Sequence, residues 1–178
     1  GVKYELAKFG HVGRVAQEWW GLFTSKASGF KTIQDIQKAA KPIRLSGVDP
    51  STQTGVSSAL FLEALGLKGR MVVGYKGSPE MMLALIAGRE IDGFIVSLPV
   101  SEPYLKAGQV YMPAQMGSKR CPRYPAIPTL LETPGLSADG KKMLELLTLL
   151  AESGRIIVAP PGTPQPRLAY LEKALMAS

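Results

Sequence analysis

The chain has 178 residues, 46% of them hydrophobic and 20% charged, which is the composition of a folded domain rather than a disordered one. No apolar run approaches the roughly 18–20 residues that a membrane-spanning helix needs. Lys and Arg outnumber Asp and Glu by 21 to 14, yet the basic residues are scattered, so we expect a mild attraction for small anions and no nucleic-acid partner.

Short apolar runs alternate with segments of helical periodicity along the chain. Strands are expected at 20–24, 43–46, 71–75, 93–98, 110–116 and 155–159. Helices are expected at 32–40 and 138–153, from residue 164 onward, and in three segments that end at Gly66, Gly88 and Gly108. This alternation predicts an α/β fold, with a mostly parallel sheet covered by helices on both faces.

Three helix starts carry recognisable N-terminal signals. Thr32, with Asp35 three residues later, fits a capping box. The segment Ser78-Pro79-Glu80 combines a hydroxyl, a proline and an acid, and Thr163 precedes another proline. We therefore expect Thr32, Ser78 and Thr163 to cap their helices.

Polar loops mark the expected binding site. In an α/β sheet, ligands bind at the carboxyl ends of the strands, a rule that selects the loops 47–55, 75–78 and 97–101. The first loop, GVDPSTQTG, is rich in hydrogen-bond donors and ends at a helix whose first N–H groups favour an anion. The candidate ligand-binding residues are Ser51, Thr52, Gln53, Thr54 and Gly55, followed by Tyr75, Lys76 and Ser97. A capped, solvated loop and an exposed lysine are the structural alternatives.

Signals for catalysis are weak. Glu90 and Asp92 precede a strand, on the side of the sheet opposite the expected ligand, so we expect them to be structural. His11 is the only histidine and Cys121 the only cysteine, which leaves no usual zinc ligand set. No serine lies in a Gly-x-Ser-x-Gly elbow, and a Ser-His-Asp triad would depend entirely on His11. We expect no metal, no cofactor and no catalysis. A small enzyme with Cys121 as nucleophile is one alternative, because the flanking residues are basic.

Several short segments, taken in order, resemble one protein family. They are 30–36 (FKTIQDI), 63–66 (EALG), 73–77 (VGYKG), 90–93 (EIDG), 124–130 (YPAIPTL) and 158–164 (VAPPGTP). Their order and spacing are similar to those of the substrate-binding proteins of tripartite tricarboxylate transporters, the Bug-type periplasmic receptors. The resemblance covers nearly the whole chain.

Family members have two lobes of the periplasmic-binding-protein-like (type II) fold. The resemblance implies that 29–153 is the second ligand-binding lobe, that 1–28 is a crossover arm toward a first lobe absent from this chain, and that 154–178 is the returning strand and helix. It implies a periplasmic, extracytoplasmic receptor that captures a small carboxylated solute with amides and hydroxyls for a membrane permease. It implies no cofactor and no reaction.

The resemblance leaves the ligand and the assembly open. Asp49 stands in a loop where the family usually has a Gly-Ser pair and then His or Asp, and it would repel a carboxylate if it faced the site. The effector-binding domain of a transcription regulator, which shares the two-lobe architecture, is a second alternative. We expect weak binding by the single lobe. The arms 15–25 and 155–177, deprived of their normal sheet, are predicted to pair between chains as a homodimer.

Overall fold

The computed structural model describes residues 5–177, which form two compact units. The larger unit is Glu18–Glu152, and the smaller unit combines Gly1–Gln17 with Ser153–Ser178. Within the described part of the chain, no helix is both long and apolar enough to cross a membrane.

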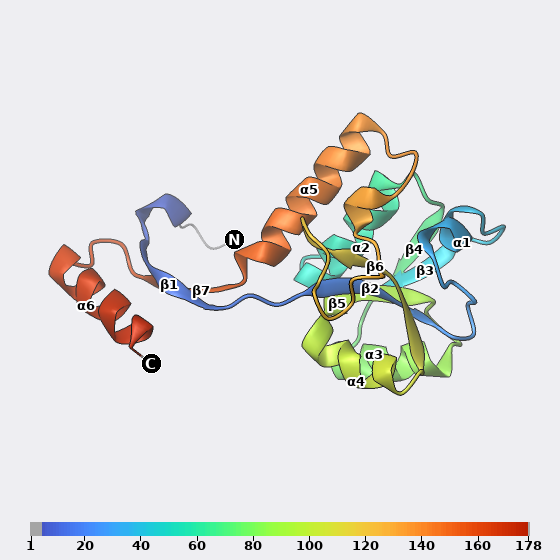
Figure 1. Ribbon diagram of the computed structural model, residues 1–178, viewed down its shortest axis with the longest axis horizontal. Coiled ribbons are helices and arrows are strands. Elements are labelled where there is room, and N and C mark those ends of the chain that lie inside the picture. The colour runs from blue at the N-terminus through green and yellow to red at the C-terminus, as the bar shows by residue number, and fades with distance from the viewer. Residues whose placement is uncertain (1–4, 178) are drawn as a thin grey trace. The chain divides into compact units, whose positions relative to one another are not determined.

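Five strands form the sheet of the larger unit, in the order β4-β3-β5-β2-β6 (Figure 1). Their bounds are Trp20–Ser25 for β2, Ile43–Ser46 for β3, Gly69–Val72 for β4, Gly93–Ser97 for β5 and Val110–Met116 for β6. β3 is parallel to β4 and β5, whereas β2 is antiparallel to β5 and β6. Four strands therefore run in one direction and β2 opposes them, so two pairings are parallel and two are antiparallel. The predicted α/β fold is confirmed, with a mixed sheet.

Helices cover both faces of this sheet, as predicted (Figure 1). The helices α1 (Ile33–Gln37), α2 (Gln53–Ala64) and α5 (Ala138–Ser153) pack on one face, and α3 (Ser78–Ala87) and α4 (Leu98–Lys106) on the other. Strand residues alternate between the two cores: Leu22 and Ile95 meet the first set of helices, and Phe23 and Phe94 meet the second. The sheet therefore lies between two apolar layers, one on each face.

Local signals predict several helix ends correctly. Thr32 Oγ1 accepts a hydrogen bond from the N–H of Asp35 at 3.2 Å, and the Asp35 carboxylate accepts one from the N–H of Thr32 at 2.8 Å. This is the expected capping box. Gly88 ends α3 in the left-handed conformation, with φ at 66°.

Two capping predictions are wrong. The N-cap of α3 is Gly77, so Ser78 is the first residue of the helix. The last helix, α6 (Gln165–Met176), has Pro164 as its N-cap, and Thr163 Oγ1 instead donates to the carbonyl of Pro160 at 2.7 Å. In both cases a neighbouring residue takes the cap position, so the hydroxyl is not needed there.

The smaller unit is a two-stranded antiparallel sheet with one helix. β1 (Gly10–Ala16) pairs with β7 (Arg155–Ala159), and α6 packs against β1. A Cβ atom added to Gly10 would lie 2.6 Å from Leu168 of α6, and one added to Gly13 would lie 2.5 Å from Leu175. Glycine therefore permits the close approach of α6 to β1. The sequence pattern does not predict β1, because the glycines interrupt its apolar alternation. Short 3-10 turns at Leu6–Lys8 and Leu130–Glu132 complete the secondary structure.

The segments 15–25 and 155–177 are not unpaired arms. β2 lies between β5 and β6 in the larger unit, so the boundary between the units falls after Gln17 rather than after residue 28. β1 and β7 pair with each other inside one chain. The expected lack of strand partners is therefore wrong, and the homodimer itself stays a prediction.

The two outermost strands of the larger sheet, β4 and β6, are poorly suited to pair with a further strand. β4 has four residues, and β6 contains Pro113, which has no N–H to donate. Proline is tolerated on an edge strand. The outer side of β6 is also partly covered, because the N–H of Gln115 donates to the carbonyl of Pro128 at 2.8 Å. Neither edge presents a long, uninterrupted row of backbone donors.

Candidate functional site

The carboxyl ends of β3, β4, β5 and β6 lie along one edge of the sheet, because these strands share a direction. We call this the exit edge, formed where the strands end at Ser46, Val72, Ser97 and Met116. The loops after β3 and β4 are joined there. The N–H of Gly47 donates to the carbonyl of Val72 at 3.3 Å, and that of Gly74 to Val48 at 3.2 Å. The predicted loops 47–55 and 75–78 are thus neighbours.

The 47–55 loop is held by its own polar groups. One carboxylate oxygen of Asp49 accepts from the N–H of Ser51 at 2.9 Å and from its hydroxyl at 2.6 Å. Thr52 Oγ1 donates to the carbonyl of Asp49 at 2.6 Å and accepts from the N–H of Gly55 at 3.3 Å, which caps α2. The hydrogen bonds from Ser51 lower the pKa of Asp49. This carboxylate is therefore ionised and turned onto its own loop.

These internal contacts leave fewer donors than the sequence predicts. The N–H groups of Ser51, Thr52 and Gly55 all donate within the loop. Those of Gln53 and Thr54 meet no acceptor among residues 5–177. They are the first two residues of α2, where unpaired N–H groups and the helix dipole attract an anion. These two N–H groups are therefore the donors that the loop leaves available to an anion.

Two glycines allow the loop to fold back on itself. A Cβ atom on Gly47 would lie 2.5 Å from the Cα of Gly55. A Cβ atom on Gly55 would lie 2.1 Å from the carbonyl oxygen of Asp49. The sequence predicts an amide contact at Gly55 but not this close approach, whose only signal is a glycine at each end of the loop.

The remaining predicted site residues lie in three different settings. The hydroxyl of Tyr75 donates a hydrogen bond to Glu90 at 3.1 Å, so it faces Glu90 rather than the start of α2. Burial, and then the contact with Glu90, raises the pKa of Tyr75. Lys76 is exposed, and its N–H donates to Glu80 at 2.6 Å. Ser97 is buried at the end of β5, on the exit edge. The structure thus brings the backbone of 75–78 to the loop but not the hydroxyl of Tyr75.

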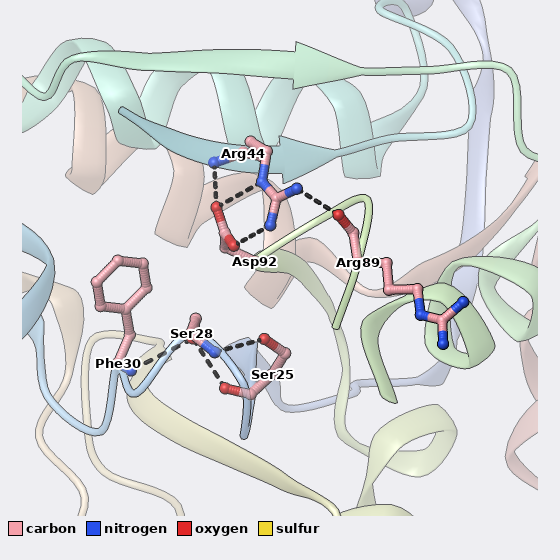
Figure 2. A network of polar contacts seen from close by, with 6 residues as sticks. All are labelled: Ser25, Ser28, Phe30, Arg44, Arg89 and Asp92. Atoms are coloured by element: carbon pink, nitrogen blue, oxygen red, sulfur yellow. Dashed lines mark hydrogen bonds and ion pairs between the residues drawn. The ribbon is translucent and has the colours of Figure 1, made fainter. Parts of the chain in front are cut away.

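Asp92 belongs to a network at the other end of the strands, opposite the exit edge (Figure 2). Its carboxylate accepts from the N–H of Arg44 at 2.8 Å and from the guanidinium at 2.7 and 3.1 Å. Arg44 also donates to the carbonyl of Arg89. A second set of hydrogen bonds joins Ser28 to Ser25. The expected structural role of Asp92 fits this arrangement.

Cys121 is a poor candidate for a nucleophile. Its side chain is 1% exposed and lies in the core beneath α3 and α4. Its N–H donates to the side chain of Gln115 at 2.7 Å. Among the described residues, no group of three or more His, Cys, Asp or Glu side chains could hold a metal ion. The structure therefore gives no support to chemistry at Cys121.

The sequence pattern favours loops that lead into helices and therefore does not select the end of β6. Gly117 and Ser118 follow β6 at the exit edge. The N–H and the hydroxyl of Ser118 both donate to Glu152, each at 2.7 Å. No local pattern links two residues 34 positions apart.

Comparison with known proteins gives a consistent result. A family model described as "Tripartite tricarboxylate transporter family receptor" matches residues 2–178. A curated protein from Cupriavidus necator, described as "UPF0065 protein in gbd 5'region", is 31% identical over 118 residues. That match spans 64% of this chain and 35% of the relative.

Solved structures share the fold at lower identity. An R. palustris protein with adipate has 24% identity and a TM-score of 0.71, over 98% of this chain and 56% of that one. MatC from Rhodopseudomonas palustris with bound malate has 19% identity and a TM-score of 0.67, over 95% and 54%. The periplasmic binding protein BugD has 24% identity and a TM-score of 0.65, over 95% and 54%. The chain spans about half the length of these proteins.

Proposed function

We propose that this chain, which belongs to the tripartite tricarboxylate transporter receptor family, acts as the second lobe of an extracytoplasmic receptor. This receptor captures a small carboxylated organic anion. The family match over residues 2–178 supports the receptor class. One protein with the same fold is solved with adipate and another with bound malate, which supports a carboxylate as the ligand.

The observation that carries the proposal is the pair of unpaired N–H groups at the start of α2. Gln53 and Thr54 present them beside the joined loops of the exit edge. A carboxylate has two oxygens that can accept from such a pair, and the helix dipole adds attraction. The hydroxyls of Ser51 and Thr52 hold the loop in shape. Recognition thus rests on neutral donors.

The wider assignment follows from the family. We place the protein in the periplasm, as a non-catalytic component that delivers its solute to a membrane permease. The unit Glu18–Glu152 is the ligand-binding lobe, and the described parts of Gly1–Gln17 and Ser153–Ser178 are the crossover segments. A receptor of this kind needs no cofactor.

Proline at position 53 gives a direct test. Gln53 is the first residue of α2, where proline is favoured, and Thr52 already has the extended conformation (φ −74°, ψ 159°) that a following proline requires. Gln53→Pro therefore removes one N–H without breaking the helix. Gln53→Ala is the matched control, because it removes the side chain and keeps the N–H.

Calorimetry with adipate and malate on the full chain measures the effect. We expect the wild type to bind one of them more weakly than micromolar, because it carries one lobe. Gln53→Pro should lower this affinity about tenfold, the usual loss of a hydrogen bond to a charged group, and Gln53→Ala should keep most of it. Equal affinities in the two variants, or no binding by the wild type, would overturn the proposal.

A further inference from the structure

We propose that the end of the larger sheet opposite the exit edge binds an anionic lipid surface through a row of basic side chains. We call this end the entry edge, where β3, β4, β5 and β6 begin and β2 ends. The basic row consists of five exposed residues, Lys26, Lys31, Lys41, Lys68 and Arg89. This surface is distinct from the proposed solute site, because it lies at the other end of the strands.

The fold gathers cations that are scattered along the sequence. Lys68 directly precedes β4, and Lys41 lies two residues before β3. Arg89 lies four residues before β5, and Lys26 directly follows β2. These four strands are neighbours in the sheet, and their register aligns their ends. Each of them therefore brings one cation to the entry edge.

The fifth strand extends the basic row. The ammonium group of Lys26 lies 3.8 Å from the centroid of the Tyr111 ring on β6, and that of Lys31 lies 5.6 Å from it. Both lysines thus lie over one aromatic ring, a contact that attracts a cation without neutralising it. Four strand spacings, about 19 Å, separate β4 from β6. The basic row therefore spans the width of the sheet.

The basic row has no acidic partners. Among residues 5–177, none of its five side chains forms an ion pair. Three acids near this end accept hydrogen bonds from other groups, namely Asp35, Glu90 and Asp92. The guanidinium of Arg89 extends away from the Asp92 carboxylate, which binds Arg44 (Figure 2). The cations of the row therefore remain available to an external anion.

The entry edge carries a net positive charge. The segments 26–44, 63–70 and 88–92 together contain eight basic and four acidic residues, of which Glu63 is exposed near the end of α2. Neighbouring strands lie about 4.8 Å apart, so the basic row places like charges next to one another. Such repulsion costs stability, and a bound anionic surface would relieve it.

The composition of the basic row favours lipid over protein as the partner. Four of its five cations are lysines. Lysine is a flexible, strongly hydrated point charge, and it is depleted at protein–protein interfaces, where arginine and aromatic residues are enriched. Headgroup phosphates form an extended anionic layer, which matches a long row of cations better than a single small anion does. Each basic residue near such a layer strengthens binding about fivefold.

Sedimentation of the full chain with lipid vesicles tests the inference. The vesicles contain phosphatidylglycerol and phosphatidylcholine in equal parts, and vesicles of phosphatidylcholine alone are the neutral comparison. We expect the wild type to bind only the anionic vesicles, and to bind more weakly as salt is raised. Lys41→Gln/Lys68→Gln should lower the partition coefficient about thirtyfold, whereas Lys41→Arg/Lys68→Arg keeps both charges and should preserve binding.

Lys76→Gln/Lys119→Gln is the matched control, because it removes two exposed lysines from the loops of the exit edge. It should weaken binding less than about threefold, through the net charge alone. An equal loss in the two glutamine variants, or no binding of the wild type to anionic vesicles at low salt, would overturn the inference. Displacement from the vesicles by soluble polyglutamate at equal charge concentration would also overturn it and indicate an acidic protein partner. None of these results bears on solute binding by the 47–55 loop.

Discussion

Arg44 and Asp92 join two neighbouring strands through backbone and side chain at once. The Asp92 carboxylate accepts from the N–H and guanidinium of Arg44, and the N–H of Asp92 donates to the carbonyl of Arg44 at 2.8 Å. The side chains are 26% and 13% exposed. The hydrogen bonds to Asp92 raise the pKa of Arg44. This pair fixes the starts of β3 and β5, and hence the positions of their ends.

Breaking this pair should destabilise the larger unit. We expect Asp92→Ala to lower the free energy of unfolding by about 2–4 kcal/mol, because Arg44 loses its partner in a partly buried place. Urea denaturation followed by circular dichroism measures the loss. Glu90→Ala removes a neighbouring carboxylate and should cost less. Similar midpoints for Asp92→Ala and the wild type would contradict the structural role.

Gly55→Ala should disrupt the 47–55 loop. Its Cβ atom would lie 2.1 Å from the carbonyl oxygen of Asp49, so the backbone must move. We expect a loss of about 2–4 kcal/mol in unfolding free energy and faster hydrogen exchange at the start of α2. Gly77→Ala is the control, because its nearest contact would be an ordinary 3.6 Å. Equal stability of the two variants would rule out the close approach.

Asp49→Asn should strengthen anion binding. The amide oxygen can still accept from Ser51, so the loop keeps its shape while one negative charge leaves the site. We expect the affinity for adipate to rise several-fold at low salt and to approach that of the wild type at high salt, where charges are screened. Calorimetry at two salt concentrations measures this. A gain that is independent of salt would point to a change in loop structure.

Glu132 should contribute to stability only above acidic pH. The side chain of Arg120, and then the N–H of Thr129, lower the pKa of Glu132 to about 2. A folded-state pKa below the unfolded value stabilises the protein above about pH 4.5, and this contribution disappears as the pH falls toward 2. Glu132→Gln should therefore be less stable at pH 6 and approach the wild type near pH 2. Parallel unfolding curves across this range would refute the assignment.

The smaller unit should mediate self-association. Val15 of β1 and Ile156 and Ile157 of β7 are 52%, 48% and 43% exposed. A two-stranded sheet with exposed apolar residues is marginal alone, and pairing with a second copy would cover it. Light scattering should detect a dimer that Ile157→Lys weakens. Leu83→Lys, which changes a 65% exposed residue of α3, should not. A wild-type monomer at high concentration would exclude the homodimer.

The sequence predicts those features whose causes are local. The bounds of β3, β6, β7 and α5 agree with the prediction, because apolar periodicity ends there at turn residues. β4 begins at Gly69 rather than at residue 71, since its register follows Ile43 of β3. The direction of β2 is set by its pairing with β5 and β6, which no pattern within the strand encodes.

For the candidate site, too, the sequence predicts features with local causes but not contacts between distant residues. The 47–55 loop is found from composition and from the helix that follows it. Which of its donors stay unpaired depends on Asp49, whose carboxylate takes two of them. The turn of Tyr75 toward Glu90 and the contact of Ser118 with Glu152 join residues 15 and 34 positions apart. Such contacts depend on how the strands are ordered in the sheet.

Pro113 in β6 has a consequence for the behaviour of the protein at high concentration. A foreign strand that tried to extend the sheet beyond β6 would find one donor missing in the middle of the edge, and beyond the short β4 it would find little to pair with. Aggregation by the addition of further strands to the sheet of the larger unit is thereby hindered.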